Sequence, residues 1–200
     1  IENINMIFDL VRQKEPISRT QLKEFTSLTA MSISRIVNFL VEQKFIVEKG
    51  EILEGRGRPA KKLLVHANKI RTLVVCFDVD CILLMIVNLK NEVLYRKSFE
   101  ATSLISMEEY VDMVYDWVKK KRIDADVISF LCPGMIHPKT GEVFVSVQLN
   151  WNHVPLKEYA EKKFDQTIIV ENDVKAALLG ETSLMTMIEK TNVVYMDIGY

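Results

Sequence analysis

The sequence has no apolar run long enough to cross a membrane. Its longest uninterrupted run, CILLMIV at 81–87, is seven residues long, whereas a transmembrane helix needs about 20. No signal peptide is visible in a sequence that does not begin with methionine. We therefore expect no membrane partner and a cytoplasmic location.

Cysteine and histidine are both scarce, with three of each in 200 residues. Cys76, Cys81 and Cys132 lie in apolar runs without disulfide-like spacing. An odd number of such cysteines suits a reducing compartment, where we expect buried thiols. The histidines are scattered, so the four ligands of a zinc site are hard to assemble. We expect no metal site and no cofactor.

Charge is nearly balanced overall but unevenly placed. The net charge is −1, and 48% of the residues are apolar, enough for a substantial core. Residues 1–66 carry 11 basic and 8 acidic side chains, a net +3, whereas residues 67–200 carry 15 and 19, a net −4. A basic segment before an acidic body suggests a nucleic-acid-binding module joined to something else.

Residues 1–66 have the pattern of a winged helix-turn-helix. The helical spacing of Ile4, Ile7, Phe8 and Val11 predicts a first helix, and Pro16 ends it. Ser18 and Gln21 form a capping box at the start of a second helix, and Thr29 is the predicted N-cap of a third. A short helix, a turn and a helix beginning at Thr or Ser are typical of the helix-turn-helix. Two β-like runs over 45–65 then predict a wing.

The exposed side of the third helix is the candidate DNA-binding surface. Small and polar side chains near a helix N-terminus suit the major groove, where the first turn faces base edges. The candidates are Thr29, Met31, Ser32, Ser34, Arg35 and Asn38. An ordinary three-helix bundle with a solvated polar face would give the same pattern, so both interpretations stay open on these helices alone.

The stretch GRGRP at 55–59 adds a second candidate DNA contact. Arg56 and Arg58 flank a glycine, and Pro59 keeps the chain extended. This shape can lie along a narrow A/T-rich minor groove with both guanidinium groups in its negative potential. The stretch resembles an AT-hook core, although a solvated loop or a hinge is the alternative. Lys61 and Lys62 could add phosphate contacts.

From residue 71 the pattern changes to alternating strands and helices. Three strand-like runs come first, and helices then alternate with strands in the order β-β-β-α-β-α-β-α-β. The sequence therefore predicts an α+β winged helix-turn-helix domain over 1–66. An α/β ribonuclease-H-like lobe, the actin-like or sugar-kinase-like layout, is predicted over 67–200.

Four motifs together resemble the ROK family of sugar kinases and transcriptional regulators. They are LTAMSISRIVNFL, GRGRP, LNWNHVPLKEYAEKKF and VENDVKAALLGE, in the family's order. The resemblance implies a sugar-sensing lobe fused to a DNA-binding head, in a cytoplasmic regulator, most simply a repressor. Its implied partners are double-stranded operator DNA, a carbohydrate or sugar-phosphate effector, and further copies of itself in a homodimer or higher oligomer.

The sequence also departs from the family's kinases. Those enzymes have a glycine in the first hairpin that receives ATP phosphates, but Asp80 stands at that position and its carboxylate would repel phosphate. The family's second phosphate loop and its zinc-binding Cys/His cluster would lie beyond residue 200. We therefore expect about half of a typical regulator, with kinase activity lost and no catalytic residue.

The stretch VENDVKAALLGE supplies the candidate sugar site. Asn172 and Asp173 are predicted at a strand end before a helix, where ligands of open α/β sheets bind. The family resemblance gives Asp173 the place of the kinases' general base and Asn172 that of a sugar ligand. An N-cap for the next helix is the alternative. Gly134 is a third candidate, because glycine permits close ligand approach, although a simple turn explains it too.

Three other functions remain as alternatives. A sugar kinase is disfavoured by Asp80. A ribonuclease-H-like nuclease needs converging carboxylates, yet the fourth strand ends in Cys132 and Pro133. A DNA-binding or dimerising half-repressor without a complete sugar site is the third.

We predict that replacing both Arg56 and Arg58 with alanine weakens DNA binding and removes a preference for A/T-rich flanks. The two arginines contribute most binding free energy in the negative potential of a narrow minor groove. Without them, the slope of log affinity against log salt concentration should flatten by roughly two charges. Affinities for A/T-flanked and G/C-flanked sites at two salt concentrations measure both effects. An unchanged flank ratio in the double variant would show that the segment is only a hinge.

Overall fold

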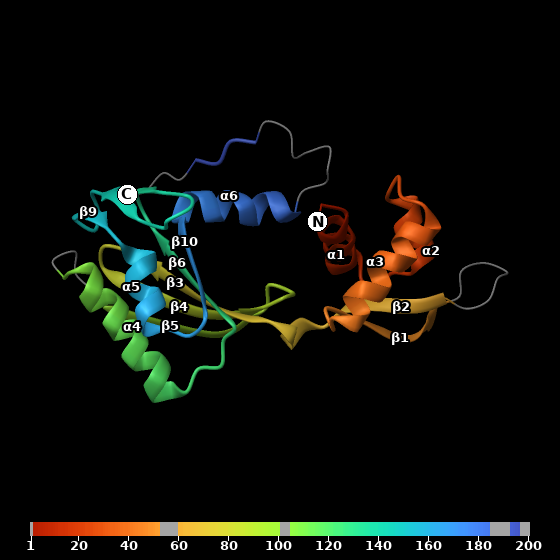
Figure 1. Ribbon diagram of the computed structural model, residues 1–200, viewed down its shortest axis with the longest axis horizontal. Helices are drawn as coiled ribbons and strands as arrows, with labels where there is room; N and C mark the ends of the chain where they lie inside the picture. Colours follow the sequence, from red (N-terminus) through yellow and green to blue (C-terminus); the bar gives the residue numbers. More distant parts are fainter. Residues whose placement is uncertain (1, 53–59, 101–104, 185–192, 197–200) are drawn as a thin grey trace. The chain divides into compact units, whose positions relative to one another are not determined.

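The computed structural model describes residues 2–52, 60–100, 105–184 and 193–196. Its contacts divide the chain into two compact units. Unit 1 comprises Ile1–Lys69 and Asn88–Glu92, and unit 2 comprises Ile70–Val87 and Val93–Tyr200. Figure 1 labels the elements of both units.

Among its described residues, unit 1 contains three α-helices, a short 3-10 helix and a two-stranded antiparallel sheet. These elements are α1 (Glu2–Lys14), α2 (Arg19–Glu24), α3 (Ala30–Glu42), β1 (Ile46–Ile52), β2 (Ala60–Val65) and the 3-10 helix η1 (Ala67–Lys69). The predicted capping box is confirmed, because the Ser18 Oγ accepts from the Gln21 N–H at 3.1 Å and the Gln21 side chain accepts from the Ser18 N–H at 2.9 Å. Thr29 caps α3 as predicted.

The core of unit 1 forms from one face of each element. Ile7 and Val11 of α1 are fully buried, and Leu63 of β2 is buried in the same cluster as these residues and Leu22 of α2. The helical spacing that predicted α1 and α3 is therefore confirmed by the burial pattern. Ile17 extends the small sheet, because it exchanges two backbone hydrogen bonds with Leu63, of 3.3 and 2.8 Å.

A segment from the middle of the chain completes unit 1. Residues 88–92 join two strands of unit 2, yet they group with unit 1. The Leu89 N–H donates to the Ala67 carbonyl at 3.0 Å, and the Leu89 side chain packs against the unit 1 core. Lys90 forms an ion pair with Glu15. Buried Asn88 shapes this turn by accepting from the backbone N–H groups of residues 90 and 92.

Unit 2 is built on a mixed five-stranded sheet with the strand order β10-β6-β3-β4-β5. Its strands are β3 (Arg71–Phe77), β4 (Cys81–Asn88), β5 (Val93–Glu100), β6 (Val127–Cys132) and β10 (Thr167–Asn172). β6 pairs in parallel with both β3 and β10, whereas β4 and β5 are antiparallel. The expected α/β architecture is thus present, with its early antiparallel and late parallel strands.

Two helices cover the buried face of this sheet: α4 (Met107–Lys121) and α5 (Leu156–Lys163). Figure 1 shows them together on one side of the sheet, with α6 (Asp173–Leu184) apart from them. A capping box begins α4, with reciprocal bonds between Ser106 and Glu109 of 2.7 and 3.2 Å. Alternate residues of β3 and β6, such as Val75 and Phe130, bury their side chains beneath these helices.

A small antiparallel sheet follows β6 and was not predicted. It consists of β7 (Met135–Ile136), β8 (Val143–Ser146) and β9 (Trp151–Val154). The last strand of the order predicted from the sequence falls on residues 192–200, and 193–196 have no regular structure. The rest of that stretch lies outside the described residues, as do Arg56 and Arg58.

Candidate functional site

The first turn of α3 is organised by hydroxyl groups. The Thr29 Oγ1 accepts from the Ser32 N–H at 3.2 Å and lies 3.0 Å from the Ser32 Oγ. These bonds satisfy a donor that would otherwise be unpaired at the start of the helix. Two of the predicted DNA-binding residues, Thr29 and Ser32, therefore have a structural role in the cap.

The remaining candidates on α3 share one face. Met31, Ser34, Arg35 and Asn38 follow helical spacing, and we call these four residues the α3 stripe. Met31 is 83% exposed, Arg35 and Asn38 are exposed, and Ser34 is half-buried. The opposite face packs into the core of unit 1 through Ile33, Val37 and Leu40. The stripe thus combines one cation, two hydrogen-bonding side chains and one apolar side chain on a rigid helix.

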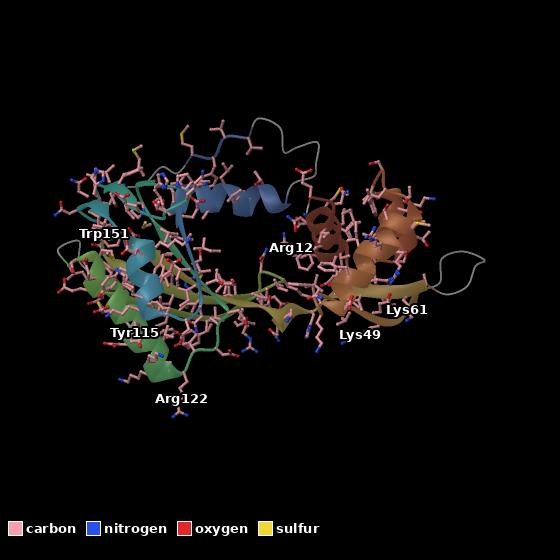
Figure 2. The ribbon with its side chains drawn as sticks, in the orientation of Figure 1. Arg12, Lys49, Lys61, Tyr115, Arg122 and Trp151 are labelled. Carbon is pink, nitrogen blue, oxygen red and sulfur yellow. The ribbon has the colours of Figure 1, made fainter. Side chains whose placement is uncertain are left out.

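Arg19 is a residue of this surface that the sequence analysis missed. It begins α2, and its Nη2 donates to the Asn38 Oδ1 at 2.9 Å and to the Glu48 Oε1 at 2.6 Å. The other Glu48 oxygen accepts from the Lys61 Nζ at 3.0 Å. Figure 2 labels Lys61 on β2. Asn38 and Glu48 lie 19 and 29 residues from Arg19 in the chain, so no local sequence pattern indicates these contacts.

A second candidate site lies at the carboxyl ends of the parallel strands. Asn172 ends β10 and is paired in register with Cys132, which ends β6. The Asn172 Nδ2 donates to the Gly134 carbonyl at 3.0 Å, while its Oδ1 accepts from the Lys175 N–H at 2.8 Å. The structure therefore brings Gly134 and Asn172 together. It also bears out the N-cap alternative for Asn172, because the bond to Lys175 satisfies the first turn of α6.

The backbone packed around Gly134 leaves no room for a side chain at this position. The φ angle of Gly134 is +120°, and a Cβ added there would lie 2.2 Å from the carbonyl oxygen of Val145. A side chain cannot be accommodated so close to the backbone of β8. This accounts for the glycine without any ligand, and it fixes the position of the carbonyl that Asn172 binds.

Asp173 introduces a negative charge beside two thiols. Burial, followed by the charge of Asp173, raises the pKa of Cys76 to about 11 and that of Cys132 to about 12. Both thiols are therefore protonated at neutral pH and unsuited to nucleophilic chemistry. The charge of Asp78, in the turn after β3, contributes to the shift at Cys76. Asp78 and Asp173 thus make this edge of the sheet electronegative.

The predicted turn of the first hairpin is confirmed. The Asp78 N–H donates to the Cys81 carbonyl at 2.9 Å, and Asp80 is exposed within the turn. Asp80 therefore places an exposed carboxylate in the turn of this hairpin. Trp151 does not supply a stacking surface for a sugar, because it is 4% exposed and its ring packs edge-on against Phe77 and Tyr110, at centroid distances of 5.5 and 5.6 Å.

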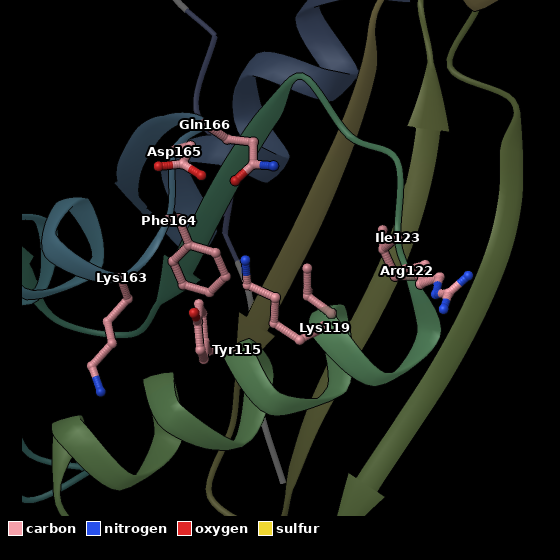
Figure 3. A pocket seen from close by; sticks show the side chains of 9 residues that line it. Tyr115, Lys119, Arg122, Ile123, Lys163, Phe164, Asp165 and Gln166 are labelled. Atoms are coloured by element: carbon pink, nitrogen blue, oxygen red, sulfur yellow. The ribbon is translucent and has the colours of Figure 1, made fainter.

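A hollow lies at the opposite edge of the same sheet, before β6 and β10 begin. Its volume is about 190 Å³. Tyr115 and Phe164 meet in it edge to face, with ring centroids 5.3 Å apart, and Figure 3 shows Arg122 pointing away from these rings. Lys163, at its rim, is paired with Asp112 at 2.8 Å. The hollow shares no residue with the three predicted sugar-binding positions.

The described part of the chain offers little to hold a metal ion. Among those residues, no group of three or more His, Cys, Asp or Glu side chains is placed to bind one. In the same ranges, no helix is long and apolar enough to cross a bilayer.

We predict that Asn172→Ala lowers the free energy of unfolding by about 2 kcal/mol. About 1 kcal/mol comes from the lost cap and about 1 kcal/mol from the lost bond to the Gly134 carbonyl. Asn172→Asp keeps the capping acceptor but sets a carboxylate oxygen against the Gly134 carbonyl beside Asp173, so it should not restore the lost stability. Urea denaturation measures both, with Asn152→Ala, at an exposed position of β9, as the control. If Asn172→Ala lowered the free energy of unfolding by no more than the control does, Asn172 would have no role as an N-cap.

Comparison with known proteins adds evidence at the level of the family. The ROK family model matches residues 72–200. A xylose repressor of Caldicellulosiruptor bescii is 23% identical over 203 residues, which cover 97% of this chain and 50% of the repressor. The chain thus spans about half the length of the curated relatives it matches.

Solved structures show the same fold. A ROK family transcriptional regulator described as a homologue of the E. coli MLC protein superposes with a TM-score of 0.71 and 23% identity, over 90% of this chain and 47% of its own. A ROK family glucokinase from Streptomyces griseus, in complex with glucose and AMPPNP, matches with a TM-score of 0.52 and 23% identity, over 58% of this chain and 37% of its own. With the family model matching well over half of its residues, the chain belongs to the ROK family.

Proposed function

We propose that this chain binds operator DNA through unit 1 and senses a carbohydrate through unit 2, as a transcriptional repressor without kinase activity. The observation that carries the proposal is the α3 stripe, a set of base-contacting residue types on one face of a capped helix, three of them exposed. The likeness to a xylose repressor over 97% of the chain supports it.

In this proposal unit 1 is a winged helix-turn-helix. α2 and α3 are the two helices of the motif, and β1 and β2 form the wing. α3 enters the major groove with its N-terminal half foremost, as recognition helices do. Arg35 is the principal base reader, because arginine pairs with the O6 and N7 acceptors of guanine. Met31 supplies an apolar contact, and Ser34 and Asn38 supply hydrogen bonds.

The GRGRP stretch completes the proposed DNA surface. Arg56 and Arg58 lie in the segment between β1 and β2, outside the described residues. Their proposed minor-groove contact rests on the sequence alone. The described neighbour Lys61 is 67% exposed even though it pairs with Glu48, so it can also approach a phosphate.

The proposed sugar site comprises Gly134, Asn172 and Asp173. Asn172 is held by two hydrogen bonds, but a carboxamide has a further N–H and a further lone pair for a sugar hydroxyl. Asp173 accepts from its neighbour Val174 through Oδ1 at 2.8 Å, which leaves its other oxygen for a hydroxyl. Carboxylate and amide groups at the carboxyl ends of parallel strands are a typical arrangement for a polar ligand.

A sugar kinase is the second candidate function. The likeness of 58% of the chain to a glucokinase in complex with glucose and AMPPNP favours it. The exposed carboxylates of the first hairpin oppose it, because they would repel the phosphates of ATP. A half-repressor that binds DNA without responding to sugar is a further candidate, since the chain spans about half of its relatives.

The DNA-binding proposal predicts that the chain enriches a specific sequence from a pool of random duplexes. Arg35→Ala should weaken binding to that sequence by about 1–3 kcal/mol if Arg35 reads a base, as measured by fluorescence anisotropy. Arg96→Ala, an exposed arginine on β5, is the control and should bind normally. A chain that enriches no sequence would refute the proposal, and an equal loss on all sequences would make Arg35 a phosphate contact.

The sensing proposal predicts that a sugar changes the affinity for the enriched DNA by roughly 5- to 150-fold, the usual range of allosteric coupling. D-xylose and D-glucose are the probes, and anisotropy is measured with and without each. Asp173→Ala should abolish the response and leave the affinity without sugar unchanged, whereas Asp165→Ala should keep both. A response that survives in Asp173→Ala would leave that residue no sugar-binding role, and no response in the unaltered chain would favour the half-repressor.

A further inference from the structure

One guanidinium group connects three elements of unit 1. Arg19 is the first residue of α2, directly after the buried N-cap Ser18. Its Nη2 donates to Asn38 of α3 at 2.9 Å and to Glu48 of β1 at 2.6 Å. Each Nη of arginine carries two protons, so a single nitrogen can make both bonds.

Glu48 is the anchor of this arrangement. Its side chain is 18% exposed and lies between Arg19, which is 32% exposed, and Lys61. Burial by itself would raise the pKa of Glu48, but the hydrogen bonds from Lys61 and Arg19 outweigh it and lower the pKa. Glu48 is therefore ionised at neutral pH and holds Arg19 through a charge-assisted bond.

The contact with Arg19 determines which way the Asn38 carboxamide faces. Arginine can only donate hydrogen bonds, so the atom of Asn38 that faces it must be the oxygen. The Nδ2 group is then directed away from Arg19 and is free to donate. Asn38 belongs to the α3 stripe and is exposed. It thus presents N–H groups, in a fixed orientation, to whatever α3 contacts.

We propose that Arg19 is a positioning residue for DNA recognition: held by Glu48, it fixes Asn38 as a hydrogen-bond donor toward the base pair that α3 reads. This inference rests on the proposed DNA-binding function. Donors match the acceptors N7 and O6 of guanine, N7 of adenine and O4 of thymine. They do not match the N4 amino group of cytosine. Asn38 therefore selects base-pair edges that present an acceptor at its position.

Removing Arg19 should change this preference rather than simply weaken the complex. Without the guanidinium, the carboxamide can turn over and offer either its oxygen or its nitrogen. At the position that Asn38 contacts, the ratio of affinities for the preferred base pair and for the others should then fall from about tenfold to near onefold. One good contact between a side chain and a base accounts for about a tenfold ratio. Preferences at the other base pairs should persist.

Arg19→Met and Lys61→Met form a matched pair for the test. Both remove one positive charge and one bond to Glu48, but only Arg19 touches Asn38. The probe is the duplex enriched from a random pool by the unaltered chain, together with all its single-base-pair variants. Asn38→Ala identifies the base pair that Asn38 contacts, because discrimination should be lost at that base pair when Asn38 is replaced. Fluorescence anisotropy gives the affinities, and thermal unfolding shows that each variant is folded.

The expected result is loss of discrimination at that base pair in Arg19→Met and its retention in Lys61→Met. Arg19→Lys, which keeps a cationic donor, should restore part of it. If Arg19→Met keeps the preference, or weakens every sequence equally, Arg19 has only a structural role and the inference is wrong. Asn38→Asp is a second test for a poorly folded Arg19 variant, because it keeps the acceptor for Arg19 but removes the donor. It should turn the preference toward cytosine.

These outcomes distinguish a failure of the Arg19 inference from a failure of the proposed DNA-binding function. If the unaltered chain enriches a sequence and Arg35→Ala weakens binding to it, DNA binding stands whatever Arg19 does. If the unaltered chain enriches no sequence, both the proposed function and the role of Arg19 are refuted.

Discussion

Parallel pairing of β6 with β3 and with β10 determines where the candidate residues of unit 2 lie. Parallel strands start at one edge of a sheet and end at the other, so the residues after β3, β6 and β10 must gather at a common edge. Asp78, Gly134 and Asp173 follow those three strands. The pairing also requires long crossovers, and these supply α4 and α5, which bury one face of the sheet. Core and candidate site therefore follow from one hydrogen-bonding pattern.

Features that depend on near neighbours in the chain could be predicted from the sequence. The capping boxes at Ser18 and Ser106 and the cap at Thr29 each involve residues three apart. Their signal is local, because a hydroxyl and the backbone N–H it satisfies are only one helical turn from each other. The order of the main strands was predicted for a similar reason, since each carries its own apolar pattern.

Features that depend on distant contacts could not be predicted. The strands of the small sheet are two to four residues long, too short for an alternating pattern to be recognised. Residues 88–92 read as an ordinary hairpin turn, and only Leu89 and Lys90 in the folded chain show that they group with unit 1. The link from Arg19 to Glu48 spans 29 residues. Nothing in the local sequence marks either partner.

Both candidate surfaces contain an asparagine whose carboxamide is fixed before any ligand binds. Asn38 is held by Arg19, and Asn172 is held by the Gly134 carbonyl and the Lys175 N–H. Ordering a free side chain on binding costs about 0.5–1.5 kcal/mol, and a fixed side chain avoids much of that cost. The partners also decide which groups stay available, since a donor-only arginine fixes the oxygen and a carbonyl fixes the nitrogen. The N-cap bond of Asn172 therefore does not compete with a binding role, because the same bond that stabilises α6 holds the carboxamide in place for a ligand.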